Sequence, residues 1–195
     1  MSNDTVGRDT ADTQIPDDFK TIQNGIVFMI DRLDYQHYIF RLMQLSFTPA
    51  EWPYALAELR RVTKHGGVVE LIEPCVMMER SPPSYTWFYE TVSGAAKLRG
   101  MDIDFVMSDM TALLTRAGLE KIEADYVSSP LGWGGKAGEI GMRNIEFLIQ
   151  AMRRTVLVGM TDAEYADVIA RIRMETRENR TWGKLYYWYG RKPKE

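Results

Sequence analysis

A helical pattern that ends at two glycines and runs straight into a β-branched segment limits the fold more than any other part of this chain. Thr48-Pro49-Ala50-Glu51 predicts a helix start, with an N-cap threonine, proline at the first helical position and a capping-box glutamate. Apolar residues then recur at helical spacing, at Trp52, Ala55, Leu56, Leu59 and Val62. Gly66-Gly67 stops the helix, residues 68–73 predict a strand, and Pro74 is expected to end it. This order is half of a βαβ unit, so it predicts an α/β fold with a parallel sheet.

Elements of both kinds follow along the chain. Helices are predicted over residues 84–98, from a capping Ser108 to Gly118, around residues 145–152, and after a second capping box at residues 161–164. Strands are predicted over residues 119–128 and 181–191. The last strand carries aromatic residues at both odd and even positions, which predicts a strand covered on each side.

The first residues differ in character from the rest. Met1 to Pro16 are polar and aperiodic, so residues 1–24 are predicted to be a disordered or irregular leader, or else the remnant of a longer N-terminal region. Residues 25–195 are predicted to form one domain. Two strand-like runs open it, residues 26–30 and 33–39, and the sequence leaves open which of them enters the sheet.

Composition excludes several classes of protein. The net charge of −3 gives no broad attraction to nucleic acid or to anionic membranes, and no apolar run is long enough to cross a bilayer. The single cysteine cannot form an internal disulfide, and the first residues have no secretory pattern. We therefore expect an intracellular protein, in the cytoplasm or the nucleus, with no nucleic-acid and no membrane partner.

The residues that most often perform chemistry are sparse and scattered. His37, His65 and Cys75 show no paired-ligand spacing, so no metal site is predicted. Neither histidine lies in a recognisable dyad with Cys75, which is expected to be a packed thiol. Glu70 and Glu73 lie around one predicted strand end, where a carboxylate either meets a ligand or is simply solvated.

One glycine pattern resembles a dinucleotide-binding loop. Residues 132–137, Gly-Trp-Gly-Gly-Lys-Ala, satisfy GxGxxG/A between a predicted strand and a predicted helix. A true fingerprint also needs a following strand that ends in an acidic residue, and the downstream sequence is helical instead. The favoured interpretation is a flexible loop whose Trp133 packs on the domain or lines a pocket.

Several stretches together resemble one family. Leu33-Asp34-Tyr35-Gln36-His37, Phe47 to Trp52, and Leu59-Arg60-Arg61-Val62-Thr63-Lys64-His65-Gly66-Gly67 through Glu73 resemble strand 4, helix D and strand 5 of class I S-adenosylmethionine-dependent methyltransferases. The residues from Ser129 to Gly135, Glu178 to Thr181 and Tyr189-Gly190 resemble the fungal LaeA-like group of that family. The resemblance covers about residues 33–191. It implies a partial doubly wound, Rossmann-like methyltransferase fold, from strand 4 to strand 7 with flanking helices.

The resemblance also implies a cofactor and its contacts. Members of the family use S-adenosylmethionine as methyl donor, held by a glycine loop after strand 1 and an acidic residue ending strand 2. Upstream of Leu33 there is no GxGxG pattern and no acidic strand end. Of the residues that follow strand 4, only His37 and, more loosely, Arg41 match positions that could touch the cofactor. Arg41 also fits a solvated arginine at a helix start.

Three hypotheses follow. The chain is a methyltransferase acting on an unknown substrate, a non-catalytic pseudo-methyltransferase that binds a partner protein, or a truncated gene product. Without strands before strand 4, the sheet would have an exposed edge, which predicts self-association.

Overall fold

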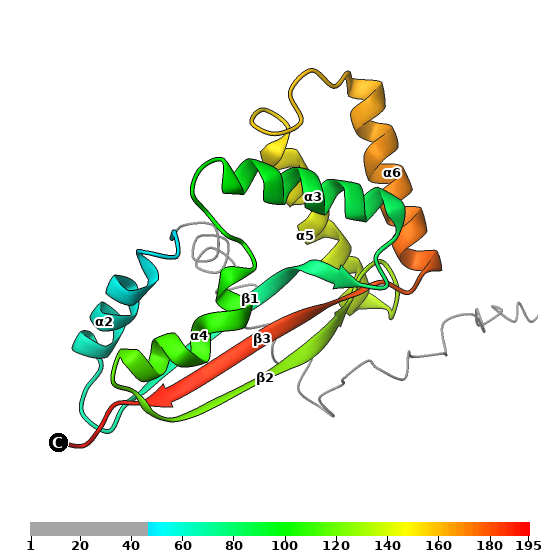
Figure 1. The fold of residues 1–195 in the computed structure, drawn as a ribbon. Helices are drawn as coiled ribbons and strands as arrows, with labels where there is room; N and C mark the ends of the chain where they lie inside the picture. The colour runs from blue at the N-terminus through cyan, green and yellow to red at the C-terminus, as the bar shows by residue number, and fades with distance from the viewer. Residues whose placement is uncertain (1–46) are drawn as a thin grey trace, which may run out of the picture.

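The computed structural model describes residues 47–195 (Figure 1). These residues form five helices and three strands. In chain order the elements are α2 (Trp52–Val62), β1 (Val68–Glu79), α3 (Pro83–Lys97), α4 (Phe105–Arg116), β2 (Glu120–Pro130), α5 (Lys136–Met152), α6 (Asp162–Glu178) and β3 (Trp182–Arg191). The predicted α/β class is confirmed for this part of the chain. The predicted leader, the domain boundary at residues 24 and 25, and the strands at 26–30 and 33–39 lie outside the described residues.

The three strands form one sheet in the order β1-β3-β2. Strand β3 is antiparallel to both neighbours, with Leu71 of β1 and Ala124 of β2 opposite Trp188. The prediction of a parallel sheet is therefore wrong for the hydrogen-bonded pairs of residues 47–195. The physical reason is the last connection, because the chain returns from α6 and inserts β3 between the two earlier strands. Since β1 and β2 both oppose β3, they run parallel to each other, and α3 and α4 lie in the crossover between them.

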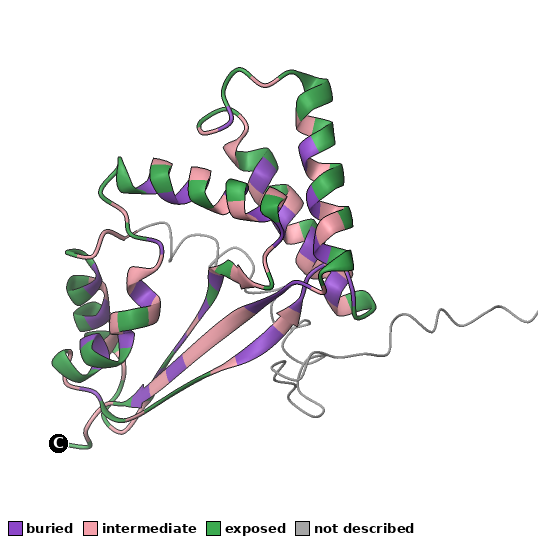
Figure 2. Cartoon of the chain, turned by 45° about the vertical axis from the view of Figure 1, so that its right-hand side comes forward, coloured by how far each residue is buried: buried purple, intermediate pink, exposed green. Residues whose placement is uncertain are grey.

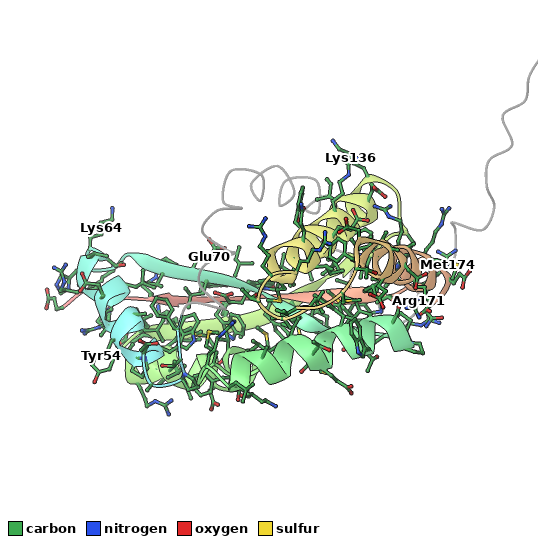
Figure 3. All side chains as sticks on the ribbon, turned by 90° about the horizontal axis from the view of Figure 1, so that it is seen from above. Tyr54, Lys64, Glu70, Lys136, Arg171 and Met174 are labelled. Atoms are coloured by element: carbon green, nitrogen blue, oxygen red, sulfur yellow. The ribbon has the colours of Figure 1, made fainter. Side chains whose placement is uncertain are left out.

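Helices lie on both sides of this sheet. Seen from above, α3 and α4 lie on one side and α5 on the other (Figure 3). We call the first side the covered face; it carries Val69, Leu71, Glu73 and Cys75 of β1 and Tyr186 and Trp188 of β3. We call the second side the open face; it carries Val68, Glu70 and Ile72 of β1, Tyr187 and Tyr189 of β3, and Glu123 and Asp125 of β2. The two faces alternate along each strand because successive side chains point to opposite sides.

Two hydrophobic cores hold the helices in place (Figure 2). The first core joins α2 and α4 to the covered face through Trp52, Leu56, Val69, Leu71, Val106, Met110, Leu113, Leu114, Leu119 and Trp188. The second core joins α3, α5 and α6 through Tyr85, Phe88, Val92, Leu131, Met142, Ile145, Ile149, Leu157, Val168 and Ile172. It lies at the end of the sheet where β1 and β2 finish (Figure 1).

The first helix and strand differ from their predicted bounds. Glu51 Oε2 accepts a hydrogen bond from the Thr48 backbone N–H at 2.8 Å, as a capping box requires, but α2 begins only at Trp52. Strand β1 does not end at Pro74; it continues to Glu79 through a register shift between Pro74 and Met78. Proline is tolerated because β1 is an edge strand of the described sheet, where a missing N–H need not interrupt a ladder.

One helix start was wrong. Helix α4 begins at Phe105, one turn before the predicted cap, and the Ser108 hydroxyl donates back to the Phe105 carbonyl at 3.0 Å. Helix α5 follows the glycine pattern and ends at Met152, as predicted; it begins at Lys136, directly after Gly135, which has a φ of 72°.

Other predictions were confirmed. Helix α6 opens with the predicted capping box, in which Thr161 Oγ1 accepts from the Glu164 N–H and Glu164 Oε2 accepts from the Thr161 N–H. The bounds of α3 and β3 agree with prediction to within a residue. The expectation that β3 is covered on each side holds for one face only, since Trp188 is buried while Tyr187 and Tyr189 are half-buried.

Candidate functional site

The most unusual side chain of the described chain is the carboxyl group of Glu73, in the middle of β1. The alternation of β1 puts it on the covered face, in line with Val69 and Leu71, and it is only 1% exposed. Tyr186 of β3 lies directly opposite. The Oε2 atom of Glu73 has no hydrogen-bond partner. A buried polar atom without a partner is rare and costly, so this oxygen is a candidate for chemistry.

Burial changes the acidity of this group. Loss of hydration disfavours the carboxylate and raises the pKa of Glu73 to about 8. The carboxyl is therefore mainly neutral at pH 7, yet it can accept or release a proton within the physiological range. A proton acceptor works best when its pKa is close to the working pH. Glu73 has that property, and such groups are enriched at functional sites.

The strand is irregular immediately after Glu73. The register with β3 shifts between Pro74 and Met78, as in a β-bulge. Tyr85 of α3 fixes this stretch, because its buried hydroxyl donates to the Val76 carbonyl at 2.9 Å. Burial also raises the pKa of the Tyr85 hydroxyl. Bulges often lie beside active sites, where they re-aim side chains.

Cys75 shares the covered face with Glu73 but is not a nucleophile in this state. The thiol is buried, as predicted, and burial raises its pKa to about 11. A thiol with a raised pKa holds almost no thiolate at neutral pH, and the thiolate is the reactive form.

Charged and aromatic side chains of β2 and β3 continue the covered face toward the second core. Lys184 forms a salt bridge with Glu79, and its Nζ lies 5.2 Å from the centroid of the Tyr126 ring. The hydrogen bond to Glu79 raises the pKa of Lys184, so the lysine stays charged. Tyr186 stacks on Trp188 with a centroid separation of 5.6 Å, and burial raises its pKa. Of these side chains Tyr186 lies opposite Glu73, whereas the ion pair with Glu79 lies at the end of β1.

A second polar pair lies at the junction of α3 and α4. The Tyr89 hydroxyl donates to Asp104 Oδ2 at 2.5 Å. Burial, and then this hydrogen bond, raise the pKa of Tyr89. The phenol is therefore a donor that holds Asp104 in place rather than a proton acceptor.

The arrangement can transfer one proton, through Glu73. No group of three or more His, Cys, Asp or Glu residues that could hold a metal ion occurs among residues 47–195. Of the described helices, none has the length and apolar character needed to span a membrane.

The residues singled out by the sequence have different outcomes. His37 and Arg41, the predicted cofactor contacts, lie outside the described residues. Glu70 and Glu73 were expected together at a strand end. Instead Glu70 is exposed on the open face (Figure 3), whereas Glu73 is buried in mid-strand. The alternation of Val69, Leu71 and Glu73 in the sequence was the signal that could have identified the buried glutamate.

The glycine-rich loop at residues 132–135 is fastened to the domain. Trp133 is 6% exposed and donates its indole N–H to the Thr181 carbonyl at 2.6 Å. The Gly132 N–H donates to the Gly138 carbonyl at 2.9 Å. Helix α5 follows directly, so the strand that a dinucleotide fingerprint needs is absent from residues 136–152. The interpretation that Trp133 packs on the domain is confirmed.

Comparison with known proteins adds no relative. A scan against models of known protein families found no match, and a search of curated proteins found no significantly similar sequence.

Proposed function

We propose that this chain is a member of the S-adenosylmethionine-dependent methyltransferase family, and that Glu73 accepts the proton of the group that becomes methylated. The observation that carries this proposal is the buried Glu73 carboxyl with its unpartnered Oε2 atom. The family part of the proposal rests on the sequence resemblance, and the substrate is unknown.

The topology is compatible with that family. Strands β1 and β2 run parallel and are joined by a helical crossover, as in doubly wound sheets, although β3 separates them. Large doubly wound sheets often include one reversed strand, so the antiparallel β3 does not argue against the proposal.

The described residues do not themselves provide a cradle for the methyl donor. The loop with a glycine pattern, residues 132–135, is fastened by the buried Trp133. The positions implied by the resemblance, His37 and Arg41, lie outside residues 47–195. We therefore assign to the described residues the removal of the proton from the group that becomes methylated, and not the binding of the methyl donor.

The role of Glu73 follows from proton balance. When an O–H or N–H group gains a methyl group, its proton has to leave. A carboxylate at Oε2 of Glu73 can take that proton, and its pKa of about 8 makes the return to solvent easy. Because Glu73 is buried, the donor group has to come within about 3 Å of Oε2 for this transfer.

Calorimetric titration of the full chain with S-adenosylmethionine and with S-adenosylhomocysteine tests the family assignment. We expect saturable binding in the micromolar range, both in the wild type and in Glu73→Gln. A labelled-methyl assay on fractionated small-molecule and protein substrates tests the role of Glu73. Transfer should drop at least about a hundredfold in Glu73→Gln and stay unchanged in Glu70→Gln, the matched control on the open face. Absence of cofactor binding would sink the family assignment.

A second candidate function, a non-catalytic module that binds a partner protein, is favoured by the open face. Glu70, Glu123 and Asp125 are exposed there beside the half-buried Tyr187 and Tyr189. Val68 adds an apolar side chain that is 49% exposed. Titration without cofactor binding, together with concentration-dependent sedimentation that is lost in a Val68→Glu variant, would favour a module whose open face binds a second copy of this chain over methyl transfer.

A further inference from the structure

A second site lies where the carboxyl ends of β1 and β2 meet, beyond the covered face. Three short segments converge there: Arg80 after β1, Leu131 to Gly135 after β2, and Arg180-Thr181 before β3. The carboxyl ends of parallel strands are the usual place for ligands in open α/β sheets. Both parallel strands of the described sheet finish at this end, which makes it a candidate ligand site (Figure 1).

Arg180 is the central residue of this end. Its Nη1 atom is buried and has no hydrogen-bond partner. The guanidinium lies over the ring of Trp133, with Cζ 5.3 Å from the ring centroid. A guanidinium has five N–H donors and never loses its charge in proteins, so a buried nitrogen without an acceptor is unfavourable. An oxygen anion would remove that cost with a charge-assisted hydrogen bond.

The backbone of Arg180 has an unfavourable conformation. Arg180 has a φ of 50° and Arg80 a φ of 53°, in the left-handed region that residues other than glycine rarely adopt. The fully buried Thr181 ties the segments together, because its hydroxyl donates to the Arg80 carbonyl at 2.9 Å and its carbonyl accepts from the Trp133 indole. Strain that persists in this way is concentrated at ligand sites.

The N-terminus of α5 adds positive potential to the same end. Helix α5 begins three residues after Trp133, and no side chain caps its first turn. A methyl group built on Gly135 would meet no atom within 4 Å, so space is open beside this terminus. The dipole of a 17-residue helix favours an anion there.

We propose that Arg180, seated on Trp133 beside the N-terminus of α5, binds the phosphate or carboxylate group of a small-molecule ligand. The planar fork of the guanidinium matches either oxyanion, and the contact with the Trp133 ring restrains its position. This site does not depend on the proposed methyl transfer, since it lies on other residues and needs no methyl donor.

The test uses the full chain with inorganic phosphate and, separately, acetate. The indole N–H resonance of Trp133 is followed by nuclear magnetic resonance. We expect a saturable shift with at least one of the two anions at millimolar concentration. Saturation by phosphate alone identifies a phosphate ligand, and saturation by acetate alone identifies a carboxylate. Arg180→Gln should weaken binding at least about tenfold, because the charged fork is lost.

Arg171→Gln is the matched control, an arginine of α6 that is exposed and paired with Asp167. It should bind the anion as the wild type does. If Arg180→Gln does not fold, Lys136→Glu replaces it, because Lys136 is exposed at the first position of α5 (Figure 3). A negative charge there should weaken binding several-fold. No saturable shift with either anion, or equal affinity in the wild type and the Arg180 variant, overturns the proposal.

Discussion

The two faces of the sheet treat the same residue type in opposite ways. Glu70 and Glu73 lie three positions apart on β1, yet Glu70 is exposed on the open face and Glu73 is 1% exposed on the covered face. Burial raises the pKa of Glu73 to about 8. The difference shows that the acidity of a carboxyl group on β1 depends on which face of the sheet it occupies. A count of carboxylates in the sequence does not reveal this difference in acidity.

The aromatic residues of β3 repeat the contrast. Trp188 on the covered face is 3% exposed and belongs to the first core, whereas its neighbour Tyr187 on the open face is half-buried. The covered face therefore combines most of the apolar packing with Glu73, whose pKa is strongly raised by burial. Matched substitutions on the covered face and on the open face test this contrast.

The largest expected effect is the pH dependence of stability that Glu73 produces. The ordinary pKa of the carboxyl is 4.5 and the folded value is about 8, so the folded protein holds this proton more tightly than the unfolded chain does. The associated stability is fully present below pH 4.5 and is lost as the pH rises through 8. The loss amounts to at most about 5 kcal/mol.

Urea unfolding at pH values from 5 to 9 measures this loss of stability. Glu73→Gln should flatten the pH dependence and stabilise the protein at pH 8, while Glu70→Gln should leave the wild-type profile unchanged. A wild-type profile that is flat between pH 5 and 9 would contradict the burial of the neutral acid.

The next effect concerns packing on the two faces. Trp188→Ala removes a buried ring from the first core and should lower the free energy of unfolding by about 3–5 kcal/mol. Tyr187→Ala, on the open face of the same strand, should cost only about 1 kcal/mol because the ring is half-buried. Denaturant midpoints of the two variants at pH 6 provide the comparison. Equal losses would mean that the open face is packed in solution by other residues or by another molecule.

Part of this contrast could be predicted from the sequence. Local patterns were sufficient for α3, α6 and β3, because capping residues and apolar periodicity are encoded within the elements themselves. The strand order β1-β3-β2 could not be predicted from local patterns. Insertion of β3 between two earlier strands depends on contacts between residues more than one hundred positions apart, such as Leu71 and Trp188.

The two candidate sites, at Glu73 and Arg180, could also be predicted only in part. The alternation of Val69, Leu71 and Glu73 contained the signal for a buried carboxyl, but Pro74 suggested a strand end where the structure has a register shift. Arg180 gave no signal at all, because its left-handed conformation and its contact with the Trp133 ring exist only after three separate segments meet. Tertiary contacts of this kind override local propensity.

The smallest effect compares polar pairs on the two faces. Lys184 and Glu79 form a half-buried salt bridge on the covered side, with the ammonium also lying over the Tyr126 ring. Solvent screens such a partly exposed pair, so Lys184→Gln should cost no more than about 1 kcal/mol. Glu123→Gln on the open face, where the carboxylate accepts from the Tyr189 hydroxyl, should change stability less still.

Thermal melts of both variants at 0.02 M and 0.5 M salt separate the loss of the ion pair from the loss of the hydrogen bond. Only the difference between wild type and Lys184→Gln should shrink as salt rises, because that variant alone loses an ion pair. If added salt leaves that difference unchanged, Lys184 stabilises the sheet through its contact with the aromatic rings rather than through Glu79.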